Sequence, residues 1–154
     1  MNRLALFLLL FVSSAQASTK ENPFDLRPMC DQLYMIATSA LTLKEQGQSK
    51  DDLLKPLPSL TALLIMPISK EKILAQHMHR IADEIFKFEN LEKSSYSAFT
   101  AETCHRQLKE LPVVDNFENA YPKLLTCKAL RSAEERIACG VAISSIEVKS
   151  AIAN

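Results

Sequence analysis

The clearest hydrophobic pattern in the chain lies between residues 70 and 88, where apolar residues recur at steps of four and three. Lysine, glutamine, arginine and aspartate fall largely on the other side of a helix drawn through this segment. Ser69 stands directly before it, at the place of an N-cap. The pattern predicts an amphipathic helix over this segment. Its apolar positions are Leu74, Met78, Ile81, Ile85 and Phe88.

A second stripe of helical spacing precedes this segment and includes the first cysteine. Pro28 suits the first turn of a helix, where its missing N–H is not needed. Gly47 stands where a residue in the left-handed conformation would end that helix. We therefore expect a helix from about Pro28 to Gly47, with Cys30 on its buried side. The stripe consists of Leu26, Cys30, Leu33, Ala37 and Ala40.

The segment between these two helices contains the most apolar run after the first seventeen residues. A short helix is expected to begin after Ser49, an N-cap residue followed by two aspartates, and to end before Pro56. The run Leu57–Ile68 follows, with Pro67 near its end. Because most such runs are buried, we expect this one to fill the core beneath the helices. An exposed run would instead bind a partner. The candidate binding residues are Leu57, Leu60, Leu64 and Ile68.

A helix over about 96–110 is expected from its apolar spacing, with Pro112 as its end. The segment 117–130 is also expected to be helical, with Pro122 in its first turn or at a kink. The buried stripe of the first of these helices would consist of Ala101, Cys104, Leu108 and Leu111.

The last predicted helix begins with a capping box, in which Ser132 is the cap and Glu135 stands three residues later. This helix would reach Val148 or beyond, and Ser144 would interrupt its apolar stripe as a polar residue. That stripe would consist of Ile137, Val141 and Val148.

The composition favours an all-α fold. The chain has two glycines and no tryptophan, and clusters of aromatic and β-branched residues are sparse. Its 18 basic residues balance its 18 acidic residues, which gives no reason to expect nucleic acid or an anionic membrane surface as a partner. We expect a single domain, a small bundle of five or six helices held by two disulfides. It would comprise a main bundle over about 25–111 and a helical hairpin over about 115–150.

The first seventeen residues have the pattern of a cleavable secretory signal. Met1–Arg3 carries a positive charge, Leu4–Val12 is an apolar run too short to span a bilayer, and Ala15-Gln16-Ala17 is a cleavage signature. Cleavage would leave 154 − 17 = 137 residues, beginning at Ser18. We therefore expect an exported protein, periplasmic or secreted, with no stable membrane insertion after cleavage.

Four cysteines allow three pairings. Cys30 and Cys104 lie on the buried stripes of two different helices, so they can meet across a helix–helix contact. Cys127 and Cys139 flank the turn between two helices, which brings them together locally. We predict the disulfides Cys30–Cys104 and Cys127–Cys139. Export and the absence of a CxxC spacing favour these disulfides over a metal site.

The stretch from Cys30 to Cys104 resembles a group of small, exported helical proteins of proteobacteria. This resemblance rests on an early cysteine, a Lys-x-x-Gly-x-Ser turn at 44–49, an amphipathic helix around 80–86 and a closing cysteine. It covers about half the chain and implies no activity.

The thirteen residues from Cys127 to Cys139 are similar to the paired-cysteine hairpin of LprI-like lysozyme inhibitors. This similarity rests on the spacing of the two cysteines, an intervening serine and an acid–base pair before an apolar turn. After Cys139 the chain departs from that family, because Gly140–Ser145 stands in place of an Asp/Leu-rich helix. The similarity implies inhibition of a lysozyme-like hydrolase and favours the local disulfide.

His77-Met78-His79 is the motif that most suggests metal binding. Residues two apart on a helix point about 200° away from each other, so these two imidazoles cannot bind one ion. His79 and Asp83, four residues apart, are expected to form a surface pair. We therefore predict no metal site and no cofactor.

Paired carboxylates are the remaining candidates for chemistry. Neighbouring residues on a helix diverge by about 100°, and two of the three pairs stand where helix starts favour acids. The pairs are Asp51-Asp52, Asp83-Glu84 and Glu134-Glu135. The sequence also contains no GxSxG elbow and no glycine-rich phosphate loop. We predict no catalytic residue and no enzyme.

These observations favour an exported, non-catalytic protein that binds another macromolecule in the bacterial periplasm or outside the cell. One alternative is an inhibitor of a lysozyme-like hydrolase, which rests on the thirteen-residue similarity. Another is a periplasmic metal-handling protein that uses the histidines.

Overall fold

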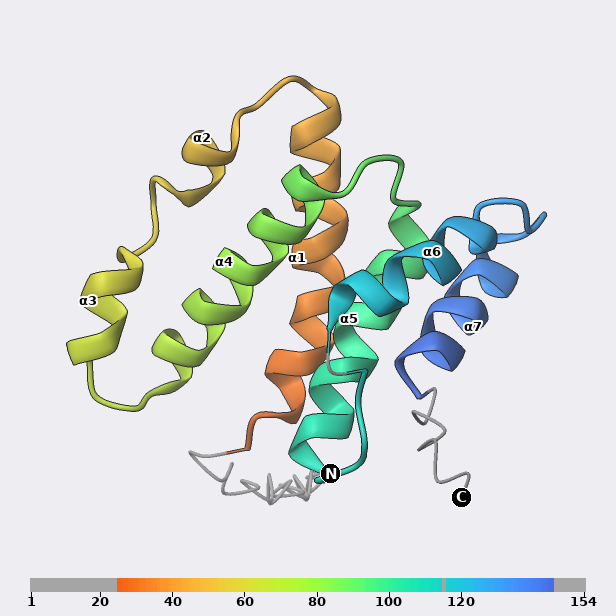
Figure 1. Cartoon of the computed structure of the whole chain (residues 1–154). Coiled ribbons are helices and arrows are strands. Elements are labelled where there is room, and N and C mark those ends of the chain that lie inside the picture. Colours follow the sequence, from red (N-terminus) through yellow and green to blue (C-terminus); the bar gives the residue numbers. More distant parts are fainter. Residues whose placement is uncertain (1–24, 115, 146–154) are drawn as a thin grey trace, which may run out of the picture.

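The computed structural model describes residues 25–114 and 116–145, which form seven helices and no strand (Figure 1). This confirms the predicted all-α class. The predicted signal peptide and Val148 lie outside the described residues. The helices are α1 (Arg27–Glu45), α2 (Lys50–Leu54), α3 (Leu60–Ile65), α4 (Lys70–Lys87), α5 (Lys93–Leu108), α6 (Phe117–Cys127) and α7 (Ala133–Ser144).

Most helix ends lie where the local sequence predicts them. Gly47 adopts a φ of +88°, and the N–H groups of Gly47 and Gln48 donate to carbonyls of the last turn of α1. Ser49 and Ser132 form capping boxes at α2 and α7, and the Ser69 hydroxyl caps α4. One of the seven helices, α3, was not predicted from the sequence. It begins because Ser59 Oγ accepts a hydrogen bond from Ala62 N.

Both predicted disulfides are present. Cys30 joins Cys104, with Cα atoms 5.4 Å apart, and Cys127 joins Cys139, with Cα atoms 5.9 Å apart. The first bond ties α1 to α5, and the second ties α6 to α7. All four cysteines of the chain are therefore paired.

Helix α5 lies between α1 and α7 and packs against both (Figure 1). Residues 95–100 are consequently all buried, whichever side of the helix they occupy. The predicted stripe of α5 is wrong except at Cys104, because Leu108 and Leu111 are exposed and Ala101 is only half-buried. Helical spacing does not extend to Leu111, since α5 ends at Leu108.

Helix α7 approaches α5 at a glycine. A Cβ atom on Gly140 would lie 2.0 Å from the carbonyl oxygen of Ser95, so only glycine fits at this contact. The predicted stripe of α7 is therefore wrong, and Val141 is exposed while Ser144 is buried. The Ser144 hydroxyl donates to Val141 O at 2.6 Å, which satisfies it inside the contact. The buried residues of α7 are Gly140, Ile143 and Ser144.

Aromatic rings join α6 to the core. The Phe117 ring lies 5.0 Å from the Phe88 ring and 5.7 Å from the rings of Tyr96 and Phe99. These edge-on contacts hold the start of α6 against the end of α4 and the first half of α5. Pro122 lies inside α6 and its side chain is exposed.

Candidate functional site

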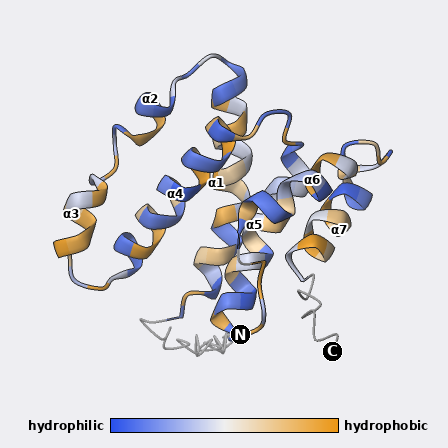
Figure 2. Ribbon diagram, in the orientation of Figure 1, coloured by the Kyte–Doolittle hydropathy of each residue, from blue (hydrophilic) through white to orange (hydrophobic). Residues whose placement is uncertain are grey.

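The segment that carries α3 presents apolar side chains to solvent. We call residues 56–69 the α3 arm. It lies at the edge of the molecule away from α6 and α7 (Figure 1), and Figure 2 shows α3 as strongly hydrophobic. Within the described residues, the three most exposed large apolar side chains all belong to this arm. The exposed fractions are 80 % for Leu64, 87 % for Ile65, 80 % for Ile68 and 57 % for Leu60.

The expectation that this run fills the core is therefore wrong. A helix of one and a half turns packed on one neighbour has a single inward side, and Leu63 occupies it with 1 % exposure. Ile65 stands two residues further on, about 200° around the helix, and so points outward. Of the four candidate binding residues, Leu60, Leu64 and Ile68 are exposed, whereas Leu57 is half-buried.

Two hydrogen bonds fix the arm to α4. His79 Nε2 lies 2.9 Å from the carbonyl oxygen of Pro58, and Lys72 Nζ donates to the carbonyl oxygen of Met66 at 2.6 Å. Because a carbonyl oxygen only accepts, the His79 bond requires the proton on Nε2. Together with the buried side chain of Leu63, these two hydrogen bonds hold the exposed side chains of the arm in a defined arrangement before any partner binds.

The charges around the arm are unevenly distributed. Residues 56–69 contain no charged side chain. Lys55 and Lys70, the nearest charged residues on either side, are both exposed. The arm is thus an uncharged apolar surface with a positive charge at each end.

The histidines serve the fold in different ways. The predicted surface pair of His79 with Asp83 is wrong, because His79 is buried against the arm and Asp83 pairs with Lys50 at 2.6 Å. His105 Nε2 lies 2.8 Å from Asp31 Oδ1, joining α5 to α1. Over residues 25–114 and 116–145, no group of three or more His, Cys, Asp or Glu side chains could hold a metal ion.

Acid should destabilise the protein through His77. Burial, with a smaller contribution from Arg80, lowers the pKa of His77 to about 4. The unfolded chain protonates this imidazole near its ordinary pKa of about 6.5, so the unfolded state binds more protons between these values and stability falls as the pH falls. Thermal melts from about pH 7 to about pH 4.5 should show a larger fall in Tm for the wild type than for His77→Gln. Parallel profiles would contradict this assignment.

The paired acids diverge as the sequence predicts. Asp52 and Glu135 accept hydrogen bonds from the backbone N–H groups of Ser49 and Ser132 and so complete capping boxes. Glu84 turns away from its neighbour into the core, where Tyr96 Oη donates to Glu84 Oε2 at 2.8 Å. Burial raises the pKa of Glu84.

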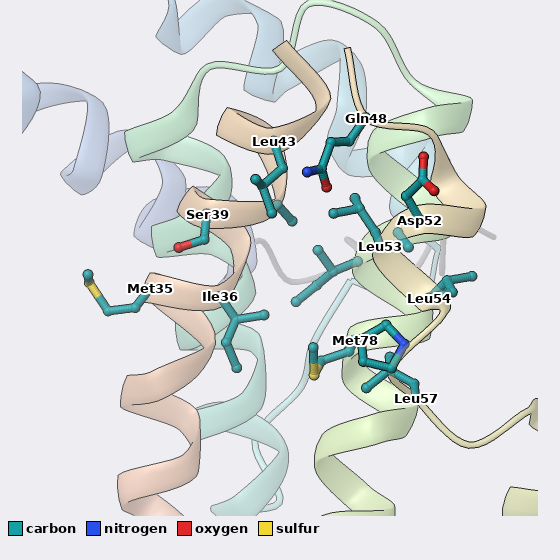
Figure 3. Close-up of a pocket in the computed structure, with 14 residues that line it drawn as sticks. Met35, Ile36, Ser39, Leu43, Gln48, Asp52, Leu53, Leu54, Leu57 and Met78 are labelled. Carbon is teal, nitrogen blue, oxygen red and sulfur yellow. The ribbon is translucent and has the colours of Figure 1, made fainter. Parts of the chain in front are cut away.

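A pocket lies beside the arm, between α1, α2 and α4 (Figure 3). Its volume is about 380 Å³, and apolar side chains supply most of its wall. A second, more open hollow of about 450 Å³ lies where α2 meets the arm and includes His79 and Asp83. Leu57 lines both hollows and is half-buried, unlike the exposed side chains of Leu60, Leu64 and Ile68.

Sequence reasoning found the apolar run but missed how it is placed. The Pro58-Ser59 pair before Leu60 is a helix-start signal that could have located α3. The His79–Pro58 bond depends on where the arm meets α4, and the pocket depends on where α1, α2 and α4 meet. The local sequence contains no signal for either.

Comparisons with known proteins return no relative. No protein-family model matches the chain, and neither curated proteins nor solved structures give a significant match. The two sequence resemblances therefore stay predictions. Among the described residues, none of the helices is both long enough and apolar enough to cross a membrane.

Proposed function

We propose that this chain is an exported, non-catalytic protein that binds a folded protein partner through the α3 arm. The observation that carries the proposal is the exposure of four large apolar side chains on a segment anchored to α4. Exposed apolar clusters of this kind mark interaction sites. Two disulfides support export, because such bonds persist in oxidising compartments.

The charge pattern indicates the chemistry of the partner. The centre of the arm has no charge, so its counterpart is an apolar groove free of unpaired charges. Lys55 and Lys70 at the two ends favour acidic residues on the rim of that groove. A short helix docked in this way follows the helix-in-groove mode of recognition.

Lysines at two arm positions should abolish this binding. Burying one large aliphatic side chain is worth about 1.5–3 kcal/mol, so Leu60→Lys/Leu64→Lys should weaken a complex by about 100-fold or more. The oxidised protein would serve as bait in a cross-linking pull-down from periplasmic extract, together with a panel of purified lysozymes. We expect a saturable partner that the wild type captures and this variant does not.

The matched control is Leu108→Lys/Leu111→Lys, which changes two exposed leucines at and just beyond the end of α5. It should capture the partner as the wild type does, and all three proteins should melt at similar temperatures. Equal capture by the arm variant, or loss of capture in both variants, would reject the arm as the binding surface.

A second candidate function is inhibition of a lysozyme-like hydrolase. The disulfide Cys127–Cys139 closes a helical hairpin from α6 to α7, which is the pairing that the similarity to lysozyme inhibitors favours. Lysozyme turnover measured with micromolar amounts of the oxidised protein tests this function directly. Undiminished turnover of every lysozyme in the panel would reject it.

A further inference from the structure

The pocket between α1, α2 and α4 is sized and lined for a small apolar molecule. Its volume of about 380 Å³ falls in the range of about 300–1,000 Å³ typical of ligand sites. Eleven of its fourteen lining residues are apolar, and the exceptions are Ser39, Gln48 and Asp52. The apolar wall includes Ile36, Leu43, Leu53, Leu57 and Met78 (Figure 3).

Two of the three polar residues of the pocket lie at one end, whereas Ser39 lies apart from them on α1 (Figure 3). Figure 3 shows Gln48 and Asp52 at one end, whereas Met78 and Leu57 lie towards the other. A ligand with one polar end and one apolar chain matches this arrangement. The apolar chain would lie along Leu53 and Met78, and its head group would meet the amide of Gln48.

Charge selects the kind of head group. Asp52 is the one charged residue among those that line the pocket, and no lysine, arginine or histidine lines it. Hydrogen bonds from Ser49 lower the pKa of Asp52, which keeps this carboxyl ionised at neutral pH. A carboxylate or phosphate head group would therefore meet a like charge without a basic partner. The Gln48 amide both donates and accepts, which suits a hydroxyl or ester group.

The basic residues near the pocket do not offset the negative charge of Asp52. Lys50 pairs with Asp83 at 2.6 Å, and neither residue lines this pocket. A cationic head group would gain a solvent-screened attraction to the exposed carboxylate of Asp52, but it would lose part of its own hydration beside the apolar wall, a cost that an uncharged group does not bear. The polar end of the pocket is therefore best matched to an uncharged group.

We infer that this pocket binds an uncharged single-chain amphiphile, such as a monoacylglycerol, with its aliphatic chain between α1 and α4. This site is distinct from the surface of the α3 arm that the proposed function uses. The arm contributes Pro56 and Leu57 to the wall of the pocket, but its exposed side chains Leu60, Leu64, Ile65 and Ile68 do not line it. The inference therefore does not depend on a protein partner.

The test uses N-phenyl-1-naphthylamine, an uncharged fluorescent probe, with the oxidised protein. Probe fluorescence should rise and saturate. Three competitors with the same twelve-carbon chain would then be compared below their micelle concentrations: monolauroylglycerol, dodecanoate and dodecyltrimethylammonium. We expect monolauroylglycerol to displace the probe at the lowest concentration. Equal displacement by all three, or preferential displacement by a charged competitor, would overturn the inference.

Two variants that fill the pocket locate the binding. Met78→Trp and Ala40→Phe each add volume at a half-buried lining position. Each should weaken probe binding by about tenfold, the equivalent of about 1.4 kcal/mol. Circular dichroism would establish that at least one of them folds. Full probe binding by a folded filled variant would overturn the assignment to this pocket.

Two further variants separate this site from the arm and test the role of charge. Leu60→Lys/Leu64→Lys should bind the probe as the wild type does, because neither Leu60 nor Leu64 lines the pocket. Loss of probe binding in this variant would place the probe on the arm and overturn the inference.

Asp52→Asn should improve competition by dodecanoate roughly threefold to fivefold, because it removes the like charge, whereas competition by monolauroylglycerol should change little. An unchanged response to dodecanoate would contradict the charge argument.

Discussion

Replacing Gly140 by alanine should lower the free energy of unfolding by about 2–4 kcal/mol, because a Cβ atom cannot fit between α7 and α5. The atom would lie 2.0 Å from Ser95 O and 2.8 Å from Ser95 C, and both belong to the backbone. A flexible side chain could move aside, but here the two helices must separate. The expected fall in Tm is roughly 6–15 °C, measured by calorimetry of the oxidised protein.

Gly47 is the matched control, since the chain has only two glycines. A Cβ atom on Gly47 meets nothing within 4 Å, although its φ of +88° is unfavourable for alanine. Gly47→Ala should therefore cost about 1–2 kcal/mol from backbone strain alone. Wild-type stability for Gly140→Ala, or a larger loss for Gly47→Ala, would contradict the close contact of α7 with α5.

Removing the Cys30–Cys104 disulfide should cost about 4–5 kcal/mol, and removing Cys127–Cys139 should cost about 3 kcal/mol. The first bond joins residues 74 apart and the second joins residues 12 apart, so the first restricts the unfolded chain more. The double variants Cys30→Ala/Cys104→Ala and Cys127→Ala/Cys139→Ala would be compared by urea unfolding.

The test is which of the two double variants loses more free energy of unfolding. Cys30 and Cys104 are also fully buried between α1 and α5, so the alanines remove packing as well as the bond. Equal losses, or a larger loss for the short loop, would show that the first disulfide does not act as the main covalent tie of the fold.

The features that the sequence predicts well are those set by neighbouring residues. Ser69 and Ser132 cap their helices because a hydroxyl three residues before an N–H needs no tertiary contact. Gly47 ends α1 for a similarly local reason. The Cys127–Cys139 pair follows from one short turn between two helices.

Buried faces built from small residues were not predictable from apolar spacing. Spacing rules search for large apolar side chains, whereas α7 meets α5 through Gly140 and Ser144. Along α5, enclosure on both sides buries Ser95 and Ser97 as completely as Tyr96. A hydrophobic stripe cannot describe a helix that is covered by two neighbours.

The candidate site shows the same limit. The sequence identifies the apolar run and three of its exposed members, but its burial was predicted wrongly because hydrophobicity alone does not fix position. Leu63 turns inward and Ile65 outward within the same short helix. The bond between His79 and Pro58, residues 21 apart, is one of the contacts that place the arm against α4.

The most direct test of the α3 arm as a binding surface is site-specific photo-crosslinking. A benzoylphenylalanine placed at Ile65, which is 87 % exposed, would be compared with one placed at Lys109, an exposed residue at the end of α5. Both proteins would be irradiated in an extract of the cells that produce this protein. The proposal predicts one saturable adduct from position 65 that is absent from position 109 and lost when Leu64→Lys is added. The same adducts from both positions, or none from position 65, would contradict it.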